Sequence, residues 1–114
     1  MEQKQPRKPK QVQLPCILES SGCGFLNGRT RELSEQEVSL QCPGLVYPGA
    51  RKPKVGTSGI LTFEFILFGN PREMLRMPCR IKYVISSTVG VQINLQSLNL
   101  HQRHCFTDLL DVKK

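Results

Sequence analysis

The chain has 114 residues, with 16 lysines and arginines against nine acidic residues, and its formal net charge is +7. This length fits one domain with a single core, and the charge favours anionic partners such as phosphates, nucleic acid or an acidic protein face. The longest apolar run, over residues 60–68, is interrupted by Thr62 and Glu64 and is too short to cross a bilayer, so no membrane span is predicted.

Residues 1–11 predict a flexible basic arm in front of the folded domain. They carry Arg7, Lys8 and Lys10 among prolines and glutamines, and no large apolar residue except Met1. The segment lacks the apolar stretch of a secretory signal, which predicts a cytoplasmic protein. We expect residues 12–114 to form the domain itself.

The first half of the domain predicts three short strands. Apolar residues alternate from Val12 to Leu18, and a turn rich in serine and glycine follows at residues 20–24. A second strand is expected over residues 28–33, and a third includes Val38, Leu40 and Cys42.

Residues 43–59 are rich in proline, glycine and lysine, and predict a long loop without periodicity. The loop contains a basic cluster, Arg51, Lys52 and Lys54. A solvated loop is the favoured interpretation of this cluster, and contact with an acidic partner is the alternative.

Three strands with short connections follow and predict an antiparallel meander. Turns are expected at residues 69–72 and 86–88. Phe65 and Tyr83 are in phase with the apolar positions, which predicts that both belong to the core. The residues expected to face inward are Leu61, Phe63, Phe65 and Leu67, then Met77, Cys79, Ile81, Tyr83 and Ile85, then Val89, Val91, Ile93 and Leu95.

The chain ends in a predicted helix that begins after Asn99, a good N-cap residue, and runs to about Val112. Because closing a sheet removes its unpaired edges, six short strands and one helix favour a barrel. The predicted fold is therefore mainly β: a six-stranded antiparallel barrel with one C-terminal α-helix.

The five cysteines are odd in number and form no Cys-x-x-Cys pair, which predicts buried, reduced thiols. His101 and Cys105 are one helical turn apart and could ligate a metal, but no further ligand pair accompanies them, so no metal or cofactor is predicted. The cysteines are Cys16, Cys23, Cys42, Cys79 and Cys105.

The order of these elements resembles the PilZ family, whose domains are six-stranded barrels followed by a helix and occur in bacterial cyclic di-GMP receptors. The resemblance covers residues 7–110 and is carried best by residues 77–84, 89–93 and 98–110. The sequence is similar in particular to the C-terminal PilZ domain of bacterial cellulose synthase. The implied ligand is cyclic di-GMP.

Two motifs bind the ligand in that family: Arg-x-x-x-Arg in the arm, and (Asp/Asn)-x-Ser-x-x-Gly between the second and third strands. The first region here has Arg7, Lys8 and Lys10, with Gln11 four residues after the arginine. The second has Glu32 and Ser34 at the matching positions and Glu37 in place of glycine. Both motifs are degenerate.

Arg29 and Arg31 flank Thr30 on the second predicted strand and are candidates for the same ligand groove. Solvent-facing charges on a half-exposed strand are the commoner explanation of such a pattern. The candidate ligand-binding residues are Arg7, Lys8, Lys10, Arg29, Arg31, Glu32, Ser34 and Glu37.

Three functions are compatible with the sequence, and none is catalytic, because no nucleophile elbow, phosphate loop or positioned carboxylate pair is present. The first is a cyclic di-GMP receptor that acts through the basic arm and the barrel surface. The second is a degenerate PilZ-like adaptor that binds protein and no nucleotide. The third and weakest is a barrel that binds single-stranded RNA.

Overall fold

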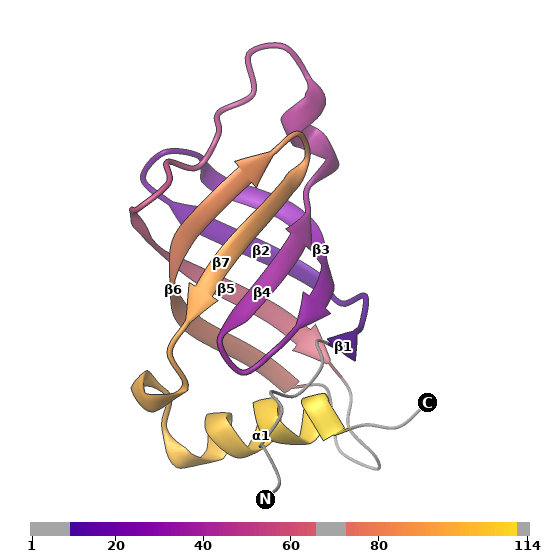
Figure 1. Ribbon diagram of the computed structural model, residues 1–114, viewed down its shortest axis with the longest axis vertical. Helices are drawn as coiled ribbons and strands as arrows, with labels where there is room; N and C mark the ends of the chain where they lie inside the picture. The colour runs from indigo at the N-terminus through magenta and orange to yellow at the C-terminus, as the bar shows by residue number, and fades with distance from the viewer. Residues whose placement is uncertain (1–9, 66–72, 112–114) are drawn as a thin grey trace, which may run out of the picture.

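The alternating apolar residues form strands that close into an antiparallel barrel, with a helix across one end (Figure 1). The computed structural model describes residues 10–65 and 73–111. The strands are β1 (Lys10–Gln11), β2 (Pro15–Ser20), β3 (Gly24–Leu33), β4 (Glu37–Gln41), β5 (Ser58–Phe65), β6 (Glu73–Ile85) and β7 (Thr88–Ile93). The helical segments are the 3-10 turns η1 (Pro43–Val46) and η2 (Leu95–Ser97) and the helix α1 (Leu100–Asp111).

Strand pairing confirms the predicted fold class. β2 pairs with β3 and β5, and the meander continues from β5 through β6 to β7. β4 closes the ring because it pairs with β7 on one side and with β3 on the other. The two residues of β1 add to the outside of this ring, where Lys10 pairs with Leu33 and Gln11 with Glu32.

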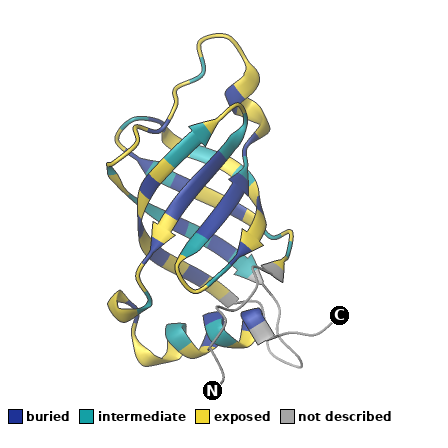
Figure 2. Cartoon of the chain, in the orientation of Figure 1, coloured by how far each residue is buried: buried dark blue, intermediate teal, exposed yellow. Residues whose placement is uncertain are grey.

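The barrel interior is filled by the apolar residues that alternate along the strands, as the dark bands in Figure 2 show. The helix closes one end, and the ring centroids of Phe106 and Phe63 lie 6.3 Å apart. Asn99 is the predicted N-cap: its Oδ1 accepts a hydrogen bond from the backbone N of Gln102 at 2.8 Å. Within the described residues, no helix combines the length and apolar character that crossing a bilayer requires.

Several element boundaries differ from the prediction. β2 begins at Pro15, although Val12 and Leu14 still pack against the core. β3 begins at Gly24, and the expected loop over residues 43–59 contains η1 and the first residues of β5. The predicted turn at 69–72, Leu67, Val112 and residues 1–9 lie outside the described residues, as does the side chain of Phe65.

The prediction that Tyr83 and Ile85 face inward was wrong. The pairing of β6 with β7 shifts register between Ile81 and Tyr83, which marks a β-bulge. Ile81 is buried, but beyond the bulge Ile85 is 65% exposed and Tyr83 is only partly buried. A Cβ on Gly90 would lie 2.1 Å from the Tyr83 ring, so the ring covers that glycine.

Candidate functional site

The outer face of β3 carries the two candidate arginines. Thr30 between them is fully buried, and both Arg29 and Arg31 are exposed. The pairing of β3 with β4 shifts register between Thr30 and Glu32, so Arg31 is an extra residue in the ladder. This bulge explains why Arg31 and Glu32 are both exposed although they are adjacent, since a bulge changes the direction of side chains along a strand.

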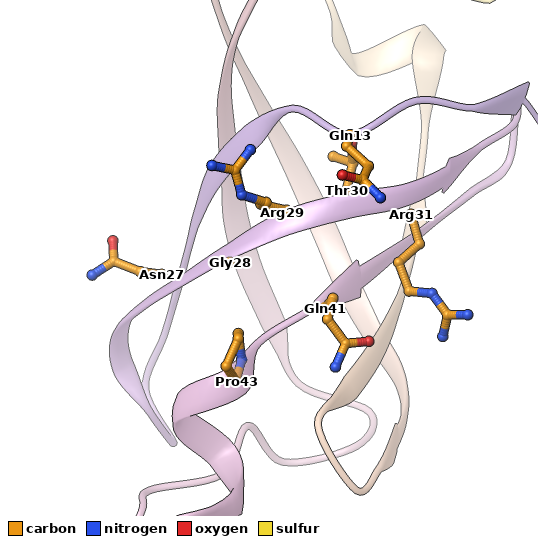
Figure 3. Close-up of a pocket in the computed structure, with 8 residues that line it drawn as sticks. All are labelled: Gln13, Asn27, Gly28, Arg29, Thr30, Arg31, Gln41 and Pro43. Carbon is orange, nitrogen blue, oxygen red and sulfur yellow. The ribbon is translucent and has the colours of Figure 1, made fainter.

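Both arginines line a groove of about 560 Å³ on the barrel surface (Figure 3). In Figure 3 the two guanidinium groups diverge, with Arg29 and Arg31 leaving β3 in different directions. The groove is lined by Gln13, Asn27, Gly28, Arg29, Thr30, Arg31, Gln41 and Pro43. Its walls therefore present two cations and several side-chain amides, which can donate hydrogen bonds to anionic or carbonyl oxygens.

Arg31 is oriented by a polar chain that crosses β4 to β7. Its Nη1 donates a hydrogen bond to the Thr88 Oγ1 at 3.3 Å, and that hydroxyl donates to Gln41 Oε1 at 3.4 Å. Gln41 Nε2 donates in turn to the Ser87 hydroxyl. The contact with Thr88 orients Arg31. It uses only one of the five N–H donors that a guanidinium group has.

Thr30 holds in place the side of the groove that Gln13 lines. Its hydroxyl accepts a hydrogen bond from the backbone N of Leu14 at 2.9 Å and donates to the carbonyl of Val12. The backbone N of Thr30 also donates to the Leu14 carbonyl at 2.9 Å. These bonds hold the segment between β1 and β2 against β3, and so place Gln13 over the groove.

A second hollow adjoins the first and extends along β3 toward the β3–β4 turn. It is lined by Gln11, Gln13, Arg31 and Glu32, so it shares Gln13 and Arg31 with the groove. The outer face of β3 is thus hollowed from Asn27 to Glu32. Among the candidates, the structure brings Arg29, Arg31 and Glu32 together on this surface.

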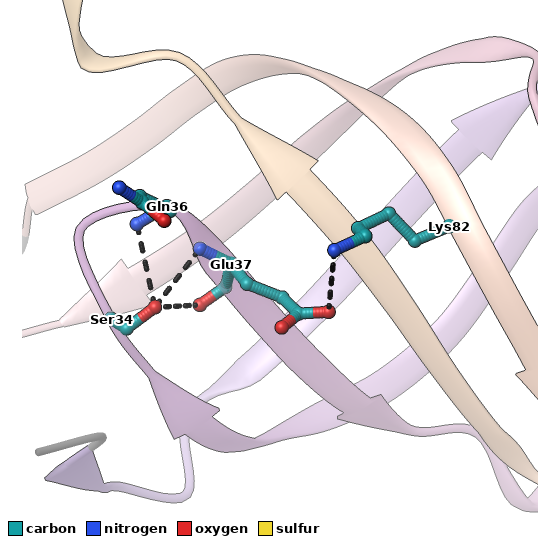
Figure 4. A network of polar contacts seen from close by, with 4 residues as sticks. All are labelled: Ser34, Gln36, Glu37 and Lys82. Atoms are coloured by element: carbon teal, nitrogen blue, oxygen red, sulfur yellow. Dashed lines mark hydrogen bonds and ion pairs between the residues drawn. The ribbon is translucent and has the colours of Figure 1, made fainter.

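Ser34 lies in the β3–β4 turn, and its hydroxyl stabilises that turn (Figure 4). The hydroxyl accepts from the backbone N of Glu37 at 3.0 Å and of Gln36 at 3.4 Å, and it donates to the Glu37 carbonyl at 2.9 Å. One donor and two acceptor sites are all that a serine hydroxyl offers. Ser34 therefore sets the shape of the turn, and it does not line either hollow.

Glu37, in the motif position where glycine is expected, forms an ion pair with Lys82 on β6 (Figure 4). Its Oε1 lies 3.7 Å from the lysine Nζ, and both side chains are partly exposed. An exposed pair of this kind adds at most about 1 kcal/mol to stability. Its local effect is to offset the negative charge of Glu37 beside the turn.

Of the candidates in the arm, Arg7 and Lys8 lie outside the described residues, and the same holds for the side chain of Lys10. The backbone of Lys10 is described, and it pairs with Leu33 at the end of β3 that leads into the Ser34 turn. The end of the arm therefore enters the barrel beside Glu32 and Leu33, next to the second hollow.

Sequence reasoning missed Gln13, Asn27, Gln41 and Lys82. None of them belongs to a charged motif. Gln41 and Lys82 reach the site only because β4 closes the ring against β3 and β7. Gln13 reaches it because Thr30 holds the segment before β2. The sequence itself carries no signal for these contacts, and the bulge at Arg31 is recognised only from the strand register and the burial of both Thr30 and Leu33 in the structure.

All five cysteines are free and buried, as predicted. Burial raises the pKa of Cys16 to about 12, with Cys42 as a second cause, and it raises the pKa of Cys79 to about 11. Burial likewise raises the pKa of Cys42 to about 11, and Cys23 contributes to that increase. These thiols are therefore neutral at physiological pH and are poor nucleophiles and metal ligands.

His101 and Cys105 contact each other on α1, with 3.6 Å between Nε2 and Sγ. Over the ranges 10–65 and 73–111, no group of three or more His, Cys, Asp or Glu side chains is placed to hold a metal ion. The pair therefore has only two of the ligands that a closed metal site needs.

Neither a protein-family model nor a curated protein matches the chain in sequence. Its structure is similar to the PilZ domain of CeSA from a cellulose-synthesizing bacterium, with a TM-score of 0.61 and 19% identity over 90% of this chain and 94% of that one. It is also similar to the Bacillus subtilis inhibitor of motility MotI/DgrA, with a TM-score of 0.68 and 6% identity. That match covers 96% of this chain and 50% of the other, so the chain spans half of that protein.

At these identities the similarities establish the fold alone, and the chain has a PilZ-like fold. The resemblance inferred from residues 77–110 is thereby confirmed at the level of architecture. Fold alone does not assign a ligand, so function has to be argued from the site.

Proposed function

We propose that this PilZ-like domain is a non-enzymatic signalling module that binds cyclic di-GMP on the outer face of β3. The observation that carries the proposal is the pair Arg29 and Arg31, both exposed and both lining one groove of about 560 Å³. Small-molecule sites are typically hollows of about 300–1,000 Å³, so the groove has a suitable size. MotI/DgrA, one of the similar structures, is named as an inhibitor of motility, which supports a regulatory role.

The chemistry of the groove suits a guanine nucleotide. A planar guanidinium group can form two hydrogen bonds with the O6 and N7 atoms of guanine or with phosphate oxygens, and it can stack on a base. Arg29 and Arg31 supply two such groups, and this pair compensates for the second arginine that the arm lacks. Gln13, Asn27 and Gln41 add amides that can hydrogen-bond the edges of the bases.

The arm is proposed to fold over the same surface when ligand is bound. Lys10 pairs with Leu33, and Arg7 is three residues earlier, so Arg7 is at most about 10 Å of extended chain from β3. Arg7, Lys8 and Lys10 would then approach the ligand phosphates from the arm. Ordering of a segment by a charged ligand is a known form of molecular switch.

Ser34 and Glu37 are assigned supporting roles. Ser34 holds the β3–β4 turn that ends the second hollow, and its hydroxyl is already fully hydrogen-bonded within that turn. Glu37 is paired with Lys82, which reduces the repulsion that its carboxylate would exert on a dianionic ligand. Glu32 lines the second hollow, where its carboxylate can accept hydrogen bonds from the N–H groups of guanine.

Calorimetric titration with cyclic di-GMP tests the proposal. We expect saturable binding, weakened about 10- to 100-fold in each of Arg29→Gln and Arg31→Gln, because a hydrogen bond to a charged group contributes about 1.5–3 kcal/mol. Arg76→Gln is the matched control, since Arg76 is an exposed arginine on β6 that does not line the groove. A flat trace at roughly half a millimolar ligand would contradict the proposal and leave the protein–protein adaptor and the weaker RNA-binding alternative.

A further inference from the structure

The connections β2–β3, β4–β5 and β6–β7 gather at the barrel end opposite α1, which we call the loop end (Figure 1). The backbone N of Cys42 donates to the Ser87 carbonyl at 2.7 Å, which joins the second connection to the third. A Cβ on Gly22 would lie 3.0 Å from the Lys52 carbonyl, so the first connection packs against the second. The loop end is thus one continuous surface.

Exposed apolar side chains are concentrated at this end. Eight large apolar residues are exposed in the described chain, and five of them are here: Phe25 (74%), Val46 (63%), Tyr47 (69%), Val55 (61%) and Ile85 (65%). The exposed loop stands clear of the barrel (Figure 2). It is anchored from beneath by Leu45 and Pro53, which are both buried. A rigid base therefore presents these apolar groups to the outside.

The β4–β5 connection of the loop end carries only positive charge, whereas the acidic Glu19 lies opposite Phe25 in the β2–β3 ladder and is 3.8 Å from Arg76 Nη2. Arg51, Lys52 and Lys54 are exposed, and none of them is within ion-pair distance of a carboxylate in the part of the chain that the structure describes. No acidic residue occurs between Val38 and Phe63. The acidic residues Glu32, Glu35 and Glu37 lie around the β3–β4 turn at the opposite end, and Asp108 lies on α1.

We propose that the loop end docks on an anionic phospholipid surface. Exposed apolar side chains combined with lysine and arginine are the features by which proteins bind the membrane interface. The apolar groups here stand on a protruding surface and come from separate segments, so a deformable lipid layer can receive each of them without a matching shape. A second copy of the chain would instead bring like charges together.

Docking at the loop end would leave the rest of the barrel accessible. The groove on β3 reaches Pro43 at the start of the β4–β5 connection, but neither the groove nor the helix α1 includes any of the three loop cations. Membrane binding and nucleotide binding are therefore separate properties of the domain, and either one can be tested without the other.

Cosedimentation of the full chain with vesicles tests the proposal. We expect binding to vesicles of equal parts phosphatidylglycerol and phosphatidylcholine, and much weaker binding to phosphatidylcholine alone. Each lysine or arginine near an anionic surface contributes about 1 kcal/mol, so Arg51→Gln should weaken binding about fivefold and removal of all three cations about a hundredfold. Added salt should weaken it further.

Two matched controls distinguish docking from a general effect of charge or hydrophobicity. Arg76→Gln removes the same charge from the side of the barrel, and Met74→Ser removes an exposed apolar side chain from β6. Arg51→Gln and Tyr47→Ser should reduce binding, whereas the two controls should have little effect. All four residues are exposed, so the thermal unfolding midpoint should change little and a loss of binding would not reflect unfolding.

Three outcomes would overturn the proposal. The first is no cosedimentation with phosphatidylglycerol vesicles at low salt. The second is equal losses in Arg51→Gln and Arg76→Gln, which would show attraction by net charge alone. The third is a concentration-dependent dimer that Tyr47→Ser abolishes, which would assign the loop end to a second copy of the chain.

Discussion

The buried thiols predict how stability depends on pH. Cys16, Cys42 and Cys79 have pKa values of about 12, 11 and 11 in the folded chain, against an ordinary value of 9.0. Above about pH 9 the unfolded chain therefore releases protons that the folded chain keeps, and the free energy of unfolding falls as the pH rises toward 11–12. Below that window the stabilisation is fully present.

Urea unfolding at a series of pH values from about 8 to 11 measures this effect, since each thiol contributes a slope of up to about 1.4 kcal/mol per pH unit. The variant Cys79→Ala should show a shallower decline, because one of the three thiols has been removed. An unfolding free energy that stays constant for the wild type through this range would show that the thiols are not buried.

Single residues were predictable to different degrees. Burial of Cys16, Cys42 and Cys79 agrees with their phase in the alternating pattern, and the pattern did not depend on long-range pairing. The roles of Arg31 and Tyr83 did depend on it, because each adjoins a β-bulge defined only against the neighbouring strand. The sequence therefore predicted which residues were apolar, but it did not predict where the alternation would shift.

At the scale of elements, one buried hydroxyl, on Thr30, contributes two of the hydrogen bonds that hold the segment between β1 and β2. Thr30→Val keeps the shape of the side chain but removes the partner of the Leu14 N–H and the Val12 carbonyl. Leaving a buried polar group without a partner costs about 1–3 kcal/mol, so we expect the unfolding free energy to fall by about that amount.

Thr30→Val should also weaken the binding of cyclic di-GMP, because Gln13 would lose its fixed position over the groove while both arginines remain. Thr30→Ser is the matched control, since it keeps the hydroxyl. Parallel urea unfolding and calorimetry on both variants measure the two effects. If Thr30→Val retained full stability and full affinity, the segment would be held by something other than this hydroxyl.

The elements themselves were largely predictable from local pattern. The meander over β5, β6 and β7 and the helix after Asn99 were predicted because period-two and period-3.6 patterns are local properties of the sequence. The boundaries of β2 and β3 were less accurate. Pro15 begins β2, and the stretch before it is held by Thr30 rather than by strand pairing.

At the scale of the whole molecule, closure of the barrel creates the candidate site. β4 pairs with both β3 and β7, and so Gln41 and Thr88 come within reach of Arg31. Closure was predicted from the need to pair strand edges, but the register of β4 could not be, because no local pattern encodes it. The groove was therefore not predictable in detail, although Arg29 and Arg31 were identified as candidates.

The distribution of charge is a second property of the whole molecule. Among the residues that the structure describes, the cations of the loop end form no ion pair, and Glu32, Glu35 and Glu37 lie around the Ser34 turn at the opposite end. Net charge alone predicted only that the partners are anionic. The fold places Arg29 and Arg31 on one surface and Arg51, Lys52 and Lys54 on another, and the two surfaces are proposed to bind different anions.

The central claim is that cyclic di-GMP binds the outer face of β3, and a backbone amide NMR titration with this ligand tests it most directly. The structure predicts saturable shifts at Gln13, Arg29, Arg31 and Gln41, and none at Lys54 and Val55 on the loop end. Unchanged spectra at roughly half a millimolar ligand, or shifts confined to the loop end, would contradict it.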